Sequence, residues 1–189
     1  MQNHFSVFTP LSVFLPWTPV VPTVEMPYQY MDAFDKGLFH PVPLILGTVA
    51  NESLIFIQEA FHTVSIEIFM GFLLDVFGAE NTVEILATYP LHSFGDNYNL
   101  LMTFLGTHYI FTCPTRKIAR DSATKGNDTF LYFFNHVLSF GKQAWGPNFT
   151  YCDNYVCHGS ELPFVYNCAR FANYSMTKGE DLLSSQMMV

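Results

Sequence analysis

Charged side chains are scarce in this sequence. Only 13% of its 189 residues are Asp, Glu, Lys or Arg, and half are hydrophobic, whereas an ordinary soluble domain has about 25% charged residues. Too few polar residues are present to cover a compact body of this size. Either the protein exposes a large apolar surface, or residues outside this chain complete its core, and we favour the second interpretation.

Basic residues are the scarcest charged class. Eight Lys and Arg stand against sixteen Asp and Glu, which gives a formal net charge of −8. Nucleic-acid binding requires a cationic face that neutralises phosphates, and the densest basic cluster is only Arg116, Lys117 and Arg120. We therefore predict no nucleic-acid partner, and we interpret this cluster as the solvated face of a helix.

Long apolar runs are also missing. The most apolar stretch, residues 54–77, is interrupted by Gln58, Glu59, His62, Glu67 and Asp75, so no transmembrane segment is predicted. The N-terminal residues are apolar but lack basic residues and are broken by Pro10 and Pro16. This pattern is not that of a signal peptide.

Only four cysteines are present, and they allow three pairings if all are oxidised. Cys152 and Cys157 are separated by four residues and could close a small loop as a disulfide. Glycosylation sequons begin at Asn51, Asn127, Asn148 and Asn173. Together with the cysteines, they favour a secreted or extracellular glycoprotein as the parent of this chain.

The order of predicted elements indicates an α/β architecture. Short apolar runs at residues 42–49 and 129–137 predict two buried strands of a parallel sheet. The predicted helices cover residues 54–77, which Gly78 ends, then 79–88, then 97–122 with a kink or break at Pro114, and finally 176–189. The proline-rich residues before position 43 are expected to be extended. A loop of about twenty residues follows the second strand, and loops of this length are often functional.

Two ionisable residues follow the predicted strands. Glu52 comes directly after the first strand, and His158 follows the second through the long loop. In α/β-hydrolases, the triad follows the chain order Ser, then Asp or Glu, then His. The alternative for Glu52 is an acid that a helix N-terminus stabilises by about 0.3–1 kcal/mol. His158 and Glu161 lack the second histidine of a zinc motif, so no metal and no cofactor is predicted.

Four segments carry a resemblance to a known family. They are PVVPTVEMP at residues 19–27, PVPLILGTVANESLIF at 41–56, HYIFTCP at 108–114 and HGSELPFVY at 158–166. In this order they resemble the C-terminal half of carboxylesterase type B, or cholinesterase-like, domains. The resemblance covers nearly all of the chain and implies an α/β-hydrolase fold, with Glu52 as the catalytic acid and His158 as the general base. It also implies that Glu161 and Gly159 support the active site, and that a glycan does not occupy Asn51.

The sequence departs from this family at several positions. Pro22-Thr23 stands where the family has Asp-Gly, His108 replaces an Asp, and Ser53 replaces the Gly after the acid. No G-x-S-x-G occurs at any of the eleven glycines, so the nucleophile and the oxyanion hole are not in this sequence. We therefore expect residues 1–189 to be the C-terminal fragment of a single domain, truncated at both ends and inactive alone.

The function that follows is hydrolysis of a small carboxylic ester by the complete protein. The alternative is a non-catalytic adhesion or storage protein on the same fold. The resemblance implies that Cys113 is either unpaired or joined to Cys168. The other histidines are interpreted as ordinary core or surface residues without a partner carboxylate: His4, His40, His62, His92, His108 and His136.

Overall fold

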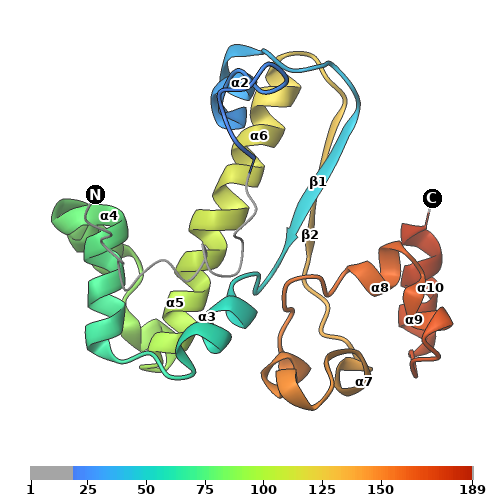
Figure 1. Ribbon diagram of the computed structural model, residues 1–189. Helices are drawn as coiled ribbons and strands as arrows, with labels where there is room; N and C mark the ends of the chain where they lie inside the picture. The colour runs from blue at the N-terminus through green and yellow to red at the C-terminus, as the bar shows by residue number, and fades with distance from the viewer. Residues whose placement is uncertain (1–18, 189) are drawn as a thin grey trace.

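The computed structural model describes residues 19–188, and its centre is a pair of parallel strands. β1 (Leu44–Val49) pairs with β2 (Thr129–Phe134) in register from Leu44 opposite Thr129 to Val49 opposite Phe134. Parallel strands require a long crossover connection, and here the helices between residues 54 and 124 supply it. Figure 1 shows this ribbon of two strands between a large helical arm and a group of short C-terminal helices.

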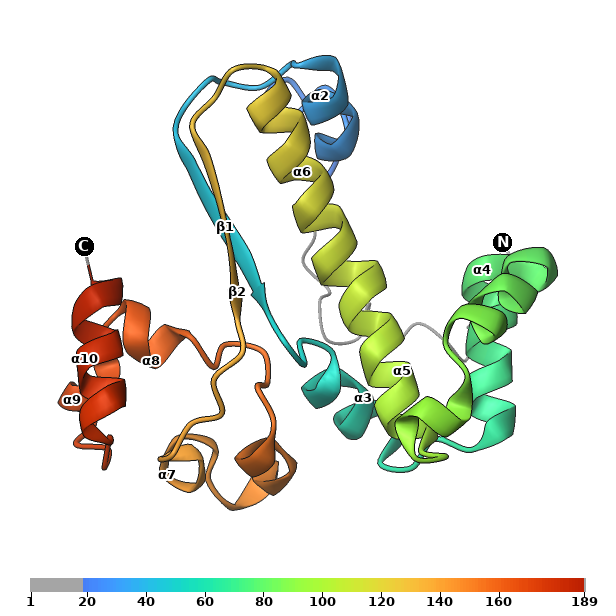
Figure 2. The same cartoon turned by 180° about the vertical axis from the view of Figure 1, so that it is seen from behind.

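The helical arm contains most of the helical residues. Its elements are α3 (Leu54–Phe61), α4 (Ile66–Thr88), the 3₁₀-helix η1 (Leu91–Phe94), α5 (Tyr98–Gly106), the π-helix η2 (Thr107–Thr112) and α6 (Cys113–Thr124). α5, η2 and α6 follow one another in a long column, which is clearest from behind (Figure 2). α6 packs on both strands, and α2 (Tyr30–Lys36) packs against α6. α2 was not predicted, because prolines surround it in the sequence.

The structure corrects the predicted helix over residues 54–77. This segment forms two helices that break at His62, whose φ of 48° is not helical. The expected interruption at Gly78 is confirmed, since Gly78 has φ 75° and ψ 168° within α4. The expected kink or break near Pro114 is seen as the π-helix η2, which interrupts the regular α-helix directly before α6. Pro114 itself lies in the first turn of α6, where proline is tolerated.

The chain after β2 is more ordered than the predicted long loop. It contains α7 (Gly141–Trp145), the 3₁₀-helix η3 (Pro147–Asn154), α8 (Leu162–Val165), α9 (Cys168–Phe171) and α10 (Lys178–Met187). α10 begins with a capping box, in which Thr177 and Glu180 satisfy each other's backbone N–H groups. The predicted C-terminal helix is therefore confirmed.

The two strands are less buried than predicted. Val49 and Phe134, at their carboxyl ends, are buried, whereas Ile45, Phe130 and Phe133 are 74%, 62% and 61% exposed. The prediction of fully buried strands is thus wrong for this chain. Within residues 19–188, α6 is the main cover of the sheet, and a two-stranded sheet needs elements on both faces to bury both sets of side chains.

The buried side chains form separate groups. One group joins α3, α4 and α5, and includes Phe69, Leu73, Leu101 and Met102. A second surrounds Phe164 and includes Val49 and Phe134 at the carboxyl ends of the two strands. A third, of Leu54, Cys152 and Cys157, lies between α3 and η3. The architecture is a mixed helical structure with a small parallel sheet, compatible with part of an α/β fold.

No single helix in the described part of the chain is both long and apolar enough to cross a membrane. α3 and α4 reach the required length and composition only as a pair, and they are bent by 119° at their break.

Candidate active site

Glu52 lies in the turn directly after β1. Its side chain is buried, with the residue only 5% exposed. Its Oε1 accepts a hydrogen bond of 2.8 Å from the backbone N–H of Val49, the last residue of the strand. This bond fixes one carboxylate oxygen against the strand, so that the second oxygen, Oε2, is available to another partner.

The loop that carries His158 is attached to the same turn. The N–H of Asn51 donates to the carbonyl of Val156 at 2.9 Å, and the N–H of Val156 donates to Asn51 Oδ1 at 3.1 Å. Asn51 and Cys157 also form an isolated parallel bridge. These contacts extend the pairing of the two chain segments beyond β1 and β2, and they bring the next residue, His158, beside Glu52.

Glu52 and His158 form a close pair. His158 Nδ1 lies 2.5 Å from Glu52 Oε2. The hydrogen bond to Glu52 raises the pKa of His158 above its usual value, although partial burial opposes this, and the charges of Glu52 and Glu161 raise it further. The ring also lies against Phe56 and Phe111, with centroids 5.5 and 5.4 Å away.

The geometry of this pair defines its possible chemistry. Because Nδ1 is held by a buried carboxylate, the imidazole has a fixed orientation and its Nε2 faces away from the carboxylate. The side chain of His158 is 51% exposed, whereas that of Glu52 is 6% exposed. A base with this exposure can reach an outside hydroxyl, and the buried acid can stabilise the imidazolium that forms.

The residues after His158 lie at the same end of the sheet. Gly159 has φ 85°, a conformation that favours glycine, and lets the chain turn sharply after His158. Glu161 Oε1 accepts a long hydrogen bond of 3.4 Å from the hydroxyl of Tyr132 on β2. Burial, and then the charge of Glu161, raise the pKa of Tyr132. Glu161 Oε2 is buried and has no hydrogen-bond partner among the described residues.

The serine after Glu52 is accommodated by a matching glycine. Ser53 is buried, and its N–H donates to Thr107 Oγ1 at 3.1 Å. A Cβ added to Gly106 would lie only 2.8 Å from Ser53 Oγ, so the larger residue in the turn fits because α5 ends in a glycine. The turn that carries Glu52 thus accommodates a serine at position 53.

Comparison with known proteins identifies the family of this chain. The Carboxylesterase family matches residues 2–189. The chain belongs to the carboxylesterase family. It is 31% identical over 159 residues to the "Crystal protein" of Dictyostelium discoideum, which covers 83% of this chain and 28% of that protein. The "cAMP-regulated D2 protein" of the same organism is 33% identical, covering 83% of this chain and 29% of that protein.

A third relative of this carboxylesterase-family chain is the "Acetylcholinesterase" of Leptinotarsa decemlineata. The two are 24% identical over 195 residues, which covers 92% of this chain and 29% of the beetle protein. The chain therefore spans less than a third of the length of the relatives it matches.

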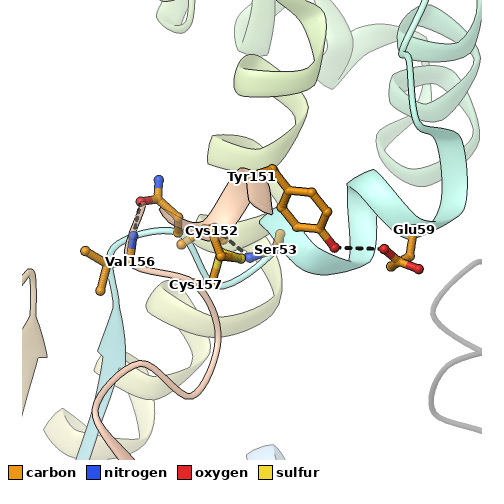
Figure 3. The surroundings of a disulfide bond; sticks show 8 residues. Ser53, Glu59, Tyr151, Cys152, Val156 and Cys157 are labelled. Atoms are coloured by element: carbon orange, nitrogen blue, oxygen red, sulfur yellow. Dashed lines mark hydrogen bonds between the residues drawn. A yellow bond between two sulfur atoms is a disulfide. The ribbon is translucent and has the colours of Figure 1, made fainter. Parts of the chain in front are cut away.

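The predicted disulfide is present in this carboxylesterase-family chain. Cys152 and Cys157 are bonded, and their sulfurs lie next to α3 (Figure 3). Cys113 and Cys168 are both free and exposed. Of the two states considered for Cys113, the structure thus shows the unpaired one.

One histidine was interpreted wrongly from the sequence. His136 has a carboxylate partner, because its Nε2 lies 2.9 Å from Glu180 Oε1. Oε1 also accepts from the N–H of Ser139 at 2.8 Å, and Oε2 accepts from the Ser139 hydroxyl and from the N–H of Thr177. The T-x-x-E capping pattern at residues 177–180 marks this glutamate as a helix cap, but its contact with His136 joins residues 44 positions apart and left no sequence signal.

The other histidines among residues 19–188 do not take part in the site. His108 lies 4.1 Å, between ring centroids, from Phe104, and burial followed by the charge of Arg116 lowers its pKa. His4 lies outside the described residues. Among residues 19–188, no group of three His, Cys, Asp or Glu side chains is arranged to hold a metal ion.

The four sequons differ in accessibility. Asn148 and Asn173 are exposed. Asn127 is half-buried and its amide donates to Ser122 at 3.4 Å. The side chain of Asn51 accepts from Val156. Two of the three glycosylation candidates, Asn148 and Asn173, are thus open to modification, whereas the amides of Asn127 and Asn51 are engaged.

Proposed function

We propose that this chain supplies the acid and the base of a Ser-Glu-His triad in a carboxylic-ester hydrolase, a serine esterase. The observation that carries the proposal is the 2.5 Å contact between His158 Nδ1 and the buried carboxylate of Glu52. The chain would be the C-terminal part of a single α/β-hydrolase domain, and the substrate would be a small carboxylic ester. The proposed reaction requires no cofactor.

In this mechanism His158 acts through its free Nε2. It takes the proton of the nucleophilic serine as the serine attacks the ester carbonyl, and then returns a proton to the leaving alcohol. Glu52 holds the imidazole in the required tautomer and stabilises the cation. Gly159 and Glu161 would support the loop, the latter through Tyr132 on β2.

The serine must come from outside these 189 residues. No G-x-S-x-G occurs in the sequence, and the chain covers less than a third of its relatives. We therefore propose that the nucleophile and the oxyanion donors belong to the rest of the domain. Loss of a single oxyanion donor costs about 10²–10³ in rate, so residues 1–189 alone are expected to be inactive.

A second candidate function is a non-catalytic adhesion or storage protein. It is favoured by the relatives named "Crystal protein" and "cAMP-regulated D2 protein", since neither name states an enzymatic activity, whereas the more distant relative is an acetylcholinesterase. Against it stands the paired geometry of Glu52 and His158, which an adhesion protein does not need.

Activity-based labelling separates the two candidates. An antibody against residues 19–188 would recover the protein from its source after treatment with a fluorophosphonate probe, and peptide mapping would locate the label. We expect label on a serine in a peptide outside residues 1–189, within the same polypeptide or a tightly bound one. Absence of label on intact, folded protein would favour the second candidate, and label within residues 1–189 would contradict the first.

We also propose that the parent protein is secreted or extracellular. The Cys152–Cys157 disulfide is typical of an oxidising compartment, and Asn148 and Asn173 are exposed sequons. Enzymatic removal of N-linked glycans should then increase the mobility of the purified protein on a gel, and N148Q together with N173Q should reduce this change.

A further inference from the structure

The loop before His158 has a second attachment to α3. The hydroxyl of Tyr151 donates a hydrogen bond of 2.8 Å to Glu59 Oε1, as Figure 3 shows. Burial, and then the contact with Glu59, raise the pKa of Tyr151, so the phenol keeps its proton and remains a donor. Glu59 lies near the end of α3, and Glu52 lies just before its start. The loop therefore contacts this helix near both ends.

The disulfide connects these two attachments. Cys152 follows Tyr151, and Cys157 precedes His158. Both cysteines are fully buried and pack on Leu54, the first residue of α3. Glu59 thus contacts Tyr151, and the disulfide next to Tyr151 leads to His158, which contacts Glu52. Helix α3 connects Glu52 back to Glu59.

The exposure of His158 makes such support necessary. Its side chain is half-exposed, so packing on the ring does not hold it by itself. The loop from residue 135 to 158 is long, and ordering each of its residues costs about 1–2 kcal/mol of backbone entropy. A catalytic group has to be held within about 0.5 Å of its productive position by supporting contacts. Asn51 provides one of these contacts, at Val156. Tyr151, on the far side of the disulfide from His158, provides the other through Glu59.

We propose that Tyr151, through Glu59, is a positioning residue that keeps His158 Nδ1 on Glu52. Its importance for catalysis rests on the function proposed above. The effect of Tyr151 on the contact between His158 and Glu52 does not rest on that function, because both residues of the contact are present in this chain. The hydrogen bond between η3 and α3 acts across the buried disulfide and limits opening of the His158 loop.

The test is proton exchange at His158 in the complete protein. The Nδ1–H of a histidine bonded to a carboxylate gives a separate proton resonance, which E52Q and H158A would assign. Loss of one hydrogen bond is worth about 1 kcal/mol, so Y151F should increase the exchange rate of this proton about fivefold. E59A should act like Y151F, and E59Q, which keeps an acceptor oxygen, should restore most of the protection.

Tyr155→Phe is the matched control. Tyr155 lies on the same loop and packs beside the same disulfide, and its hydroxyl has no hydrogen-bond partner among residues 19–188. In Y155F, the exchange rate of the His158 Nδ1 proton should equal that of the unsubstituted protein. If Y151F lowers the free energy of unfolding but leaves the exchange rate unchanged, Tyr151 is only structural and the proposal is wrong. Equal effects of Y151F and Y155F would contradict it as well.

A second readout separates this proposal from the proposed function. In the complete protein, Y151F should slow fluorophosphonate labelling by less than fivefold, because labelling follows the closed fraction of the His158 loop while exchange follows its small open fraction, whereas Y155F should leave the labelling rate unchanged. If the unsubstituted complete protein is not labelled, but Y151F still speeds exchange of the His158 Nδ1 proton, the esterase function is rejected and the positioning role of Tyr151 remains.

Discussion

Two histidine–carboxylate pairs lie in this chain, and they are built differently. Glu52 and Glu180 are both buried, and His158 and His136 both have half-exposed side chains. Glu180 accepts hydrogen bonds from Ser139 and Thr177 in addition to His136. Glu52 accepts from one backbone N–H besides His158. The carboxylate of Glu180 is satisfied mainly by its own helix cap and by Ser139, whereas that of Glu52 depends on its histidine.

The ring nitrogens show the same contrast. His158 contacts its carboxylate through Nδ1, and His136 contacts Glu180 through Nε2. In a serine-hydrolase triad the carboxylate binds Nδ1 and the nucleophile binds Nε2. Only the Glu52–His158 pair has this orientation. A histidine beside a buried acid is therefore not sufficient evidence of catalysis, because the second pair fixes α10 to the end of β2.

The largest expected difference between the pairs is in activity. In the complete, fluorophosphonate-reactive protein, E52Q should reduce kcat by about 10⁴, the effect of losing the tautomer-fixing acid in a triad. Glu180→Gln should change kcat by less than about tenfold, since the carboxylate of Glu180 is bonded to His136, Ser139 and Thr177 and not to the proposed catalytic pair. Steady-state hydrolysis of a p-nitrophenyl ester measures both, and an equal loss in the two variants would remove the functional distinction.

For stability, substitution of Glu180 should have the larger effect and substitution of Glu52 the smaller one. E180A removes a buried carboxylate that accepts hydrogen bonds from His136, Ser139 and Thr177, and since each hydrogen bond to a charged group is worth about 1.5–3 kcal/mol, the loss should be about 3 kcal/mol or more. Glu52→Ala leaves fewer donors without a partner and should cost about 1–3 kcal/mol. Urea unfolding of the complete protein, followed by circular dichroism, compares them. A larger loss in E52A than in E180A would contradict this comparison.

The two pairs should also respond to opposite ends of the pH range. Burial alone would raise the pKa of Glu180, but hydrogen bonds from Ser139, His136 and Thr177 outweigh it and lower the pKa to about 2. Its contribution to stability is then present above the ordinary carboxyl pKa and is lost as pH falls toward about 2. The free energy of unfolding should decline over this acid range in the parent chain and change less in Glu180→Gln.

For His158 the sign is the reverse. Its pKa is raised by Glu52, so its contribution to stability is full below the ordinary histidine pKa and is lost as pH rises through the folded value. A titration followed by the ring C–H resonance should give a pKa above the ordinary value, and E52Q should lower it. An unchanged titration in E52Q would show that the contact is not maintained in solution.

The smallest expected effect concerns the helix cap that orients Glu180. Thr177 accepts from the N–H of Glu180 and begins α10. Thr177→Ala should cost about 1 kcal/mol, a typical value for loss of an N-cap residue. Thr177→Ser is the control, because it keeps the hydroxyl and should stay close to the parent chain in urea unfolding.

Several features of the fold could be predicted because their causes are local. Gly78 interrupts α4 where a glycine can adopt a positive φ. Asn97 and Thr177 cap the helices that follow them, and Cys152 and Cys157 are close enough in sequence to form a disulfide without a long-range constraint. Each of these features depends on residues within one or two turns of the chain.

The break between α3 and α4 shows why others could not be predicted. Apolar residues continue at helical spacing across it, so the periodicity favours one helix. In the structure, Asn99 from α5 accepts from the N–H of Val64 at 2.8 Å and donates to the carbonyl of His62 at 3.1 Å. The backbone groups released by the break are satisfied by a residue that is more than thirty positions away.

The sequence by itself determined the order of strand, acid, helices, strand, loop and histidine, and with it the family. Local propensity, turn residues and motif spacing are sufficient for this. Tertiary structure alone decided which histidines received a carboxylate, how exposed the two strands are, and that Tyr151 reaches Glu59. These properties depend on contacts between residues 29 to 106 positions apart, whose geometry is fixed only when the helices pack beside the sheet.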